Sequence, residues 1–326
     1  MGERDAKGSE LRADAAWSVS LEQTAPALDE MELRAALDPR RGAPARTLED
    51  ALAVTRERHG VDFRSARARA GIARGHLVEV VVELPGGRGD AAEHEAMDTL
   101  LELVLGEARV ADWIGDGTVL PAPRGGALKV VQPRPDAARF FALAELKDAI
   151  EAAVAGIHAG LPDAPLWSLG GEQRWYLLEL EGTSEPLAPE SDLVLVSTFM
   201  PELLKSYLAG APFASTRFSR AHELFAYLRY ENEEADARRA LSRRRVLEDA
   251  LDAALVSERT GRVIGGGMGL RHSHVHFALE RPAHGVTRAR QIAAKLRVGG
   301  PGSAICFCDH ALVRGVAAER SRPAGS

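Results

Sequence analysis

The feature that most constrains the fold is an order of strands and helices that occurs once in each half of the chain. Over residues 77–159, hydrophobic periodicity predicts strands at 77–84, 109–117 and 128–131 and helices at 90–106 and 136–159. A further strand near Leu166 completes this series. Over residues 224–310, the same analysis predicts strands at 224–230, 262–269, 272–279 and 304–310 and helices at 233–256 and 286–296.

Both series have the order β-α-β-β-α-β, and their first strands begin 147 residues apart, at 77 and 224. This order is that of the ferredoxin-like split βαβ unit, an antiparallel sheet with both helices on one face. We therefore expect an α+β protein of two tandem ferredoxin-like halves that arose by internal duplication. The predicted parts are a disordered N-terminus at 1–15, a first half at 16–165 and a second half at 166–326. Matching strands at 17–22 and 193–198 lie near the starts of the two halves.

Composition excludes several classes of protein. The formal charge of −6 provides no overall basic field, which argues against a nucleic acid partner. No apolar run approaches the roughly 20 residues that a membrane helix needs, and no apolar segment follows the charged N-terminus, so we expect neither membrane insertion nor secretion. The 2 cysteines lie too close together in sequence to staple a fold, and we expect reduced thiols in a cytoplasmic protein.

Two short segments of the second half carry most of the residues that bind transition metals. Alternate side chains of a strand share a face, so His272, His274 and His276 form one row. A second row follows on the last predicted strand, with Cys306, Cys308 and His310. Imidazole and thiolate groups bind zinc, copper or nickel, so each row is a candidate metal site.

The predicted sheet order separates these two rows. In a ferredoxin-like sheet the first strand lies between the third and the fourth, and here its outward side chains are Phe225 and Tyr227. Two interpretations follow. The row of histidines binds a metal alone, or the His and Cys rows form an outer sheet face that is buried against the first half. A catalytic Cys308 with His310 as its base is a third alternative, and it requires a lowered thiol pKa.

Two other clusters have structural interpretations. The run Gly265-Gly266-Gly267-Met268-Gly269 leads into a strand rather than a helix, so we expect a hairpin or bulge with positive φ, not a phosphate loop. The arginines between 238 and 245 are flanked by carboxylates three to five residues away, which favours intrahelical ion pairs on a solvated helix face.

No sequence motif specifies a reaction. We expect a non-enzymatic binding or regulatory protein, of the kind that immunity proteins represent, whose partner is a protein or a small ligand. It would act through its sheet faces or through a cleft between the halves, with the following residues as candidates for the cleft: Asp112, Trp113, Asp116, Trp167, Trp175 and Tyr176. The alternative function is transition-metal binding or metal-dependent hydrolysis at the row of His272, His274 and His276.

Overall fold

The computed structural model describes residues 46–122, 140–171, 173–179, 193–208, 212–232, 237–269, 271–298, 303–309 and 312. The described chain divides between Gly160 and Leu161 into two compact units, and each has its own sheet. The predicted mixed α+β class is confirmed. The expected disorder at 1–15 and the strands predicted at 17–22 and 128–131 lie outside the described residues. Within those residues, no helix is both long and apolar enough to cross a membrane.

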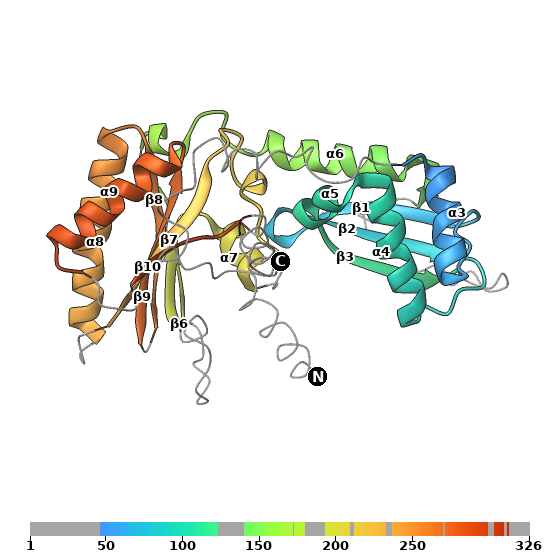
Figure 1. The fold of residues 1–326 in the computed structure, drawn as a ribbon, viewed down its shortest axis with the longest axis horizontal. Coiled ribbons are helices and arrows are strands. Elements are labelled where there is room, and N and C mark those ends of the chain that lie inside the picture. The colour runs from blue at the N-terminus through green and yellow to red at the C-terminus, as the bar shows by residue number, and fades with distance from the viewer. Residues whose placement is uncertain are drawn as a thin grey trace, which may run out of the picture. The chain divides into compact units, whose positions relative to one another are not determined.

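The first unit is a four-stranded sheet with helices. Its elements are α3 (Leu48–His59), β1 (Arg67–Ala73), β2 (Leu77–Leu84), α4 (Ala91–Leu105), α5 (Glu107–Trp113), β3 (Ile114–Pro121), β4 (Phe141–Ala142) and α6 (Leu146–Ala159) (Figure 1). The strand order is β3-β2-β1-β4. β1 is antiparallel to β2 and β4, whereas β2 and β3 are parallel neighbours.

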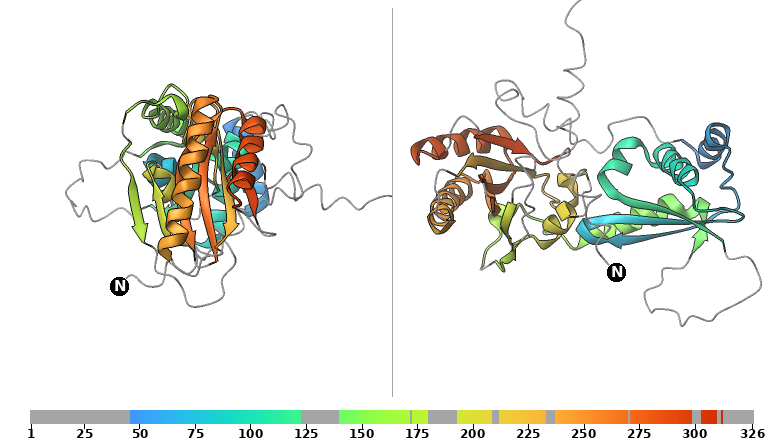
Figure 2. Two further views of the ribbon diagram at one scale, coloured as in Figure 1. Left: turned by 90° about the vertical axis from the view of Figure 1, so that its left-hand side faces the viewer. Right: turned by 90° about the horizontal axis from the view of Figure 1, so that it is seen from below.

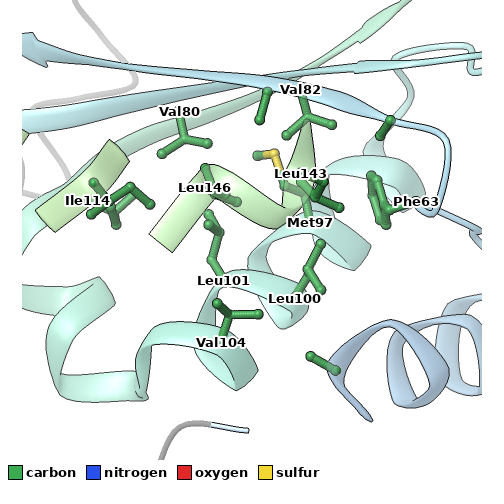
Figure 3. Close-up of a cluster of buried hydrophobic side chains, with 14 of the residues drawn as sticks. Phe63, Val80, Val82, Met97, Leu100, Leu101, Val104, Ile114, Leu143 and Leu146 are labelled. Atoms are coloured by element: carbon green, nitrogen blue, oxygen red, sulfur yellow. The ribbon is translucent and has the colours of Figure 1, made fainter. Parts of the chain in front are cut away.

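One hydrophobic core joins this sheet to its helices. Val80 and Val82 of β2 point toward Met97 and Leu101 of α4 and toward Leu146 of α6 (Figure 3). The α6 residues in this core recur at helical spacing, which gives that helix a single apolar face: Leu146, Ile150, Val154 and Ile157.

The strand predicted at 109–117 is wrong in its first half. Residues Glu107–Trp113 form α5, which follows Gly106 at a φ of 90°. Val110 and Trp113, three residues apart, both contact the core, which is a helical rather than an alternating pattern. β3 then begins at Ile114 and pairs directly with β2.

The second unit is a six-stranded sheet in the order β10-β7-β9-β8-β6-β5, in which all neighbouring strands are antiparallel. Its elements are the short helix η3 (Leu166–Ser168), β5 (Tyr176–Glu179), β6 (Leu193–Thr198), α7 (Pro201–Leu208), the short helix η4 (Ser215–Arg217), β7 (Leu224–Glu231), α8 (Ala237–Ser257), β8 (Gly261–Gly269), β9 (His272–Leu279), α9 (Pro282–Lys295) and β10 (Ala304–Phe307). Helices α8 and α9 cover one face of this sheet (Figures 1 and 2). The strands predicted at 193–198 and 272–279 are confirmed at their full lengths.

The expected tandem duplication is not confirmed, because corresponding strands are connected differently in the two units. In the first unit the strands on either side of α4 and α5 are neighbours, since β2 pairs with β3. In the second unit β9 lies between the strands on either side of α8, β7 and β8. Residues Leu166–Ser168 form η3 rather than the strand expected near Leu166, so the described part of the first unit lacks the last strand of the predicted series.

Candidate functional site

The described residues of the His and Cys rows lie on the outer face of the second sheet, opposite α8 and α9. The alternating residues Val275, Phe277 and Ile305 belong to the core beneath the two helices. Tyr227 and Cys306 belong to a separate cluster on the other face. This confirms the predicted orientation of the strands, with apolar residues toward the helices and the two rows pointing away from them.

Tyr227 separates the two rows. In the register of the sheet it lies opposite His276 on one side and opposite Cys306 on the other. Its ring is stacked with that of His274 at 5.3 Å between centroids and with that of His276 at 5.4 Å. The predicted aromatic barrier between the rows is confirmed at this position, whereas His310 lies outside the described residues.

The row of histidines is largely sealed from solvent. His274 is 3% exposed, and His272 and His276 are half-buried. Burial, and then the neighbouring His276 and His272, lowers the pKa of His274 well below its ordinary value. Burial, with a further contribution from Arg244, lowers the pKa of His276 to about 4. Both imidazoles are therefore neutral at pH 7, and among the described residues their buried Nε2 atoms have no hydrogen-bond partner.

The arrangement of these rings does not suit one metal ion. Nitrogen ligands lie about 2.0–2.1 Å from zinc, so two imidazoles that share an ion must converge on one point. The rings of His274 and His276 are instead stacked, with 6.2 Å between centroids and 22° between planes. In the described part of the chain, no group of three or more His, Cys, Asp or Glu side chains is placed to hold a metal ion.

The cysteines are placed as core residues. Cys306 is 1% exposed and Cys308 is 2% exposed, and neither forms a disulfide. Burial, followed by the charges of Cys306 and Asp309, raises the pKa of the Cys308 thiol well above its ordinary value. A nucleophilic thiol needs the opposite shift, so the direction of this shift argues against the catalytic alternative for Cys308.

Residues of the same unit pack over part of this outer face. The expected burial of the face against the first half of the chain stays a prediction. The cluster that contains Tyr227 and both cysteines also contains four residues of the segments around η3, α7 and η4: Leu166, Leu203, Phe213 and Phe218. The rings of Phe213 and Phe218 stack at 5.1 Å and tilt against Phe225.

The glycine run lies inside β8 and forms no turn. The expected bulge is present between Val263 and Gly265, but none of the run's glycines has a positive φ. These glycines allow atoms of β6 and α8 to lie close to the backbone of β8. A Cβ at Gly265 would lie 2.6 Å from the Ser197 carbonyl oxygen, and one at Gly266 would lie 2.1 Å from Oε1 of Glu248.

Gly266 leaves space for the ion pair between Arg244 and Glu248 of α8, which the sequence predicts to lie on a solvated helix face. Arg244 Nε lies 3.0 Å from Glu248 Oε1, and its Nη2 donates to Ser197 Oγ at 3.2 Å. The intrahelical pairing is thus confirmed for these two residues, but the Arg244 side chain is only 4% exposed rather than solvated. Burial raises the pKa of Glu248, although Arg244 opposes this shift. Arg244 thereby connects α8 to Ser197 of β6. The ion pair lies against Gly266 of β8, where a larger side chain would clash with Glu248.

Sequence analysis missed a second glycine-rich segment. Residues 85–90 connect β2 to the N-terminus of α4, which is the context in which backbone amides bind phosphate. Here the amides of Arg88 and Gly89 donate to the Glu93 carboxylate, the shortest contact being 2.6 Å from Gly89 N. Asp90 caps the helix by accepting from Glu93 N at 3.1 Å. The Asp90–Glu93 spacing is a capping-box signal, and Glu93 occupies the place that an anion would take.

The predicted cleft residues differ in their surroundings within their own units. Trp113 and Asp112 are 1% and 5% exposed and are buried within the first unit. Trp167 donates its Nε1 hydrogen to Glu280 in the second unit. Trp175 and Tyr176 are exposed, and the side chain of Asp116 lies outside the described residues.

The most unusual surface of the second unit is the edge strand β5, which lies at one end of the sheet (Figure 2). Trp175, Tyr176 and Leu177 are consecutive and are 50%, 38% and 65% exposed. Strand β5 pairs with β6, and within the described residues no strand pairs with its other edge. A free strand edge with exposed apolar side chains is a template for pairing with another strand.

The other three edge strands among the described residues lack a run of exposed large apolar side chains. β4 has only two residues, and β3 ends at Pro121, which lacks an amide hydrogen. All four residues of β10 are buried. β5 is therefore the edge among the described strands that presents contiguous large apolar side chains.

Comparison with known proteins gives no relative. No protein-family model matches the chain, and neither a curated protein nor a solved structure matches it.

Proposed function

We propose that this protein is a non-enzymatic binding protein that takes up an extended polypeptide segment on the free edge of β5. The observation that carries the proposal is the exposure of Trp175, just before β5, and of Tyr176 and Leu177 within it, on a strand whose second edge pairs with no other described strand. In this mode of recognition the backbone of the ligand extends the sheet, and side-chain contacts select the ligand.

The edge is fixed to the rest of the sheet before any partner arrives. Trp175 packs edge-to-face on Phe199 at 5.6 Å between centroids, and Arg174 lies over the Tyr176 ring at 5.3 Å. The preceding segment is held by Arg262, whose Nη1 donates to the Leu169 carbonyl at 2.9 Å. A rigid edge loses less conformational entropy when it binds, which favours recognition.

The outer sheet face is a weaker candidate than the edge. Four apolar residues of the same unit already cover the region around Tyr227 and the cysteines. A partner would have to displace that cover before reaching the face, whereas it can reach Leu177 directly. The proposal thus narrows the expected binding through sheet faces to binding along one sheet edge.

The most strongly shifted carboxyl group is also better suited to structure than to catalysis. Burial raises the pKa of Glu223 to about 7. Its Oε1 accepts from Leu166 N at 2.9 Å and its Oε2 accepts from Ser219 Oγ at 2.7 Å, and the residue is 1% exposed. A general acid or base must reach its substrate, and these contacts enclose both oxygens.

The test is site-specific photo-crosslinking in cells that naturally make the protein. A photoreactive amino acid replaces Leu177, and in the control it replaces Val246, a 57% exposed aliphatic residue of α8. We expect crosslinks to a polypeptide from position 177, which disappear when Leu178→Pro is added to break the edge. If position 177 yields no more crosslinked polypeptide than position 246, the proposal is wrong.

Two finer features accompany this proposal. We propose a ferredoxin-like fold for the part from β7 to β10, supported by the element order β-α-β-β-α-β and by the strand order β10-β7-β9-β8. We also propose a cytoplasmic location, supported by two buried cysteines that form no disulfide.

Transition-metal binding by the row of histidines is the second candidate function. The buried Nε2 atoms of His274 and His276, which lack a hydrogen-bond partner among the described residues, favour it. At least one ring would have to rotate, because the stacked rings do not converge. Elemental analysis of the untagged protein tests this candidate. Stoichiometric zinc, copper or nickel that is lost in His274→Ala would support it, and metal-free protein of unchanged stability would exclude it.

A further inference from the structure

We propose that the connector, residues 161–169, is held on the second unit in a pH-dependent way: it is anchored while Glu223 carries a proton and is released when Glu223 and Glu280 are both ionised. The connector follows the division of the chain between Gly160 and Leu161 and leads toward β5. Its release is a local opening that does not depend on binding at the β5 edge. Two neighbouring carboxyl groups that hold adjacent residues of η3 carry the proposal.

The connector is anchored through both the donors and the acceptors of η3. The amide of Leu166 donates to Oε1 of Glu223 at 2.9 Å, and Trp167 donates its Nε1 hydrogen to Glu280. In the other direction, Nη1 of Arg262 donates to the Leu166 carbonyl oxygen at 3.4 Å. The Leu166 side chain is 3% exposed and belongs to the core cluster on the outer sheet face. Two of these polar contacts therefore depend on the state of a carboxyl group.

Glu223 and Glu280 lie beside each other at one end of the sheet. Glu223 precedes β7 and Glu280 follows β9, next to Leu224 and Leu279, which form the last pair of that register. Glu223 is 1% exposed, so water does little to screen its carboxyl group from that of Glu280. Like charges on paired strands repel, and burial strengthens the repulsion. Ionisation of both groups is therefore unfavourable while the connector is in place.

Other charged groups surround this pair without forming an ion pair with Glu223 among the described residues. They are Asp163 of the connector, Arg220 and His222 before β7, Arg259 and Arg262 around the start of β8, Arg281 after β9, and Asp309 after β10. Arg220 pairs with Asp163, and Arg259 lies over the Trp167 ring at 5.9 Å. Burial chiefly, with the charge of Glu280 in addition, raises the pKa of Glu223 to about 7, although its hydrogen bonds from Ser219 and Leu166 oppose this shift.

Loss of the proton from Glu223 weakens the anchored state. Release of the connector lets water reach this carboxyl group, so its pKa returns from about 7 toward 4.5. The anchored state binds the proton more tightly, so its advantage is greatest below pH 4.5 and is lost as the pH rises to about 7. Within this range the equilibrium constant for opening increases by up to about tenfold per pH unit, and above it the constant levels off.

The test is hydrogen exchange of the full-length protein, followed by NMR from pH 5 to 8. We expect the protection factor of the Leu166 amide, corrected for intrinsic exchange, to fall on the order of a hundredfold, and that of the Trp167 indole hydrogen to fall with it. The Cys308 amide, which donates to the Phe225 carbonyl at 2.9 Å, should be more protected than Leu166 at every pH, because local opening leaves the sheet intact. A constant protection factor at Leu166, or equal protection at Leu166 and Cys308, would overturn the proposal.

Two variants identify the titrating pair. Glu223→Gln keeps an oxygen that can accept from the Leu166 amide but cannot ionise, so protection of Leu166 should no longer depend on pH. Glu280→Gln leaves the buried group in place and removes the neighbouring charge, so the fall in protection should become smaller. Asp249→Asn, on an exposed residue of α8, is the matched control and should behave as the wild type. An unchanged fall in either glutamine variant would contradict the proposal.

Discussion

Strands β5 and β10 are the two edges of one sheet, and they differ in almost everything except length. Each has four residues and, among the described strands, one antiparallel neighbour. All four residues of β10 are buried, with Ile305 and Phe307 under the helices and Cys306 on the outer face. In β5, by contrast, Tyr176 and Leu177 are 38% and 65% exposed.

The difference shows what each edge contributes. β10 contributes to two cores at once, so its short length is offset by burial on both faces. β5 has no comparable burial, yet it carries side chains whose exposure to water is unfavourable. A strand that adds little to its own core and exposes apolar surface is suited to pairing with another strand.

The largest effect that separates the two edges is on stability. Phe307→Ala removes a 3% exposed ring from the core and should lower the free energy of unfolding by about 3–5 kcal/mol. Leu177→Ala should change it by no more than about 0.5 kcal/mol, because the side chain is 65% exposed. Urea unfolding of both variants at low protein concentration measures the difference. Similar losses in the two variants would remove the contrast between the edges.

A second substitution weakens the β5 side of the sheet alone. Gly265→Ala places a methyl group 2.6 Å from the Ser197 carbonyl, so β6 must move away from β8. We expect a loss of about 1–3 kcal/mol and faster amide exchange in β6 than in β10. Gly71→Ala in β1 is the matched control, since nothing lies within 4 Å of its added Cβ, and it should be close to neutral. Equal effects of the two substitutions would show that close approach does not explain the glycine.

The third prediction concerns the tie between Glu223 and Leu166, in the segment that leads toward β5. Burial raises the pKa of Glu223 from 4.5 to about 7, so the folded state binds the proton more tightly than the unfolded state. The contribution of Glu223 to stability is therefore greatest below pH 4.5 and declines as the pH rises to 7. Glu223→Gln should lack this decline and should match or exceed the wild type above pH 7. A constant difference between the two proteins from pH 4 to 8 would contradict this assignment.

The smallest expected change in stability is at His276 on the outer sheet face. Its dependence on pH is opposite in sign to that of Glu223. Burial lowers the pKa of His276 from 6.5 to about 4, so the unfolded state binds the proton more tightly. Its contribution to stability is present above pH 6.5 and is lost as the pH falls through 4. In a Glu223→Gln background, His276→Gln should reduce the remaining loss of stability toward acid pH. An unchanged acid slope in urea titrations would show that His276 is not buried as described.

Local pattern predicted much of the second unit. Alternation placed β9 at its full length and set Val275 and Phe277 toward the helices and Tyr227 away from them. These assignments depend only on the period of a strand. The first unit was less predictable, since Glu107–Trp113 is too short for strand and helix periods to be separated with certainty, and it folds as α5.

The site was less predictable than the fold. The residue type and spacing of the histidines predicted a metal site. Metal binding also depends on the orientation of the rings, and a sequence does not show that the rings of His274 and His276 stack. Exposure of Leu177 depends on which strand is at the edge, and strand order is a property of the whole sheet. Buried Arg244 likewise required knowledge that α8 lies over Gly266.

The most direct test of the central claim is hydrogen–deuterium exchange at the two edge strands of the purified full-length protein. We expect the backbone amides of residues 176–179 to exchange faster than those of residues 304–307, because β5 is largely exposed and all four residues of β10 are buried. Equal exchange rates at the two edges would contradict the account.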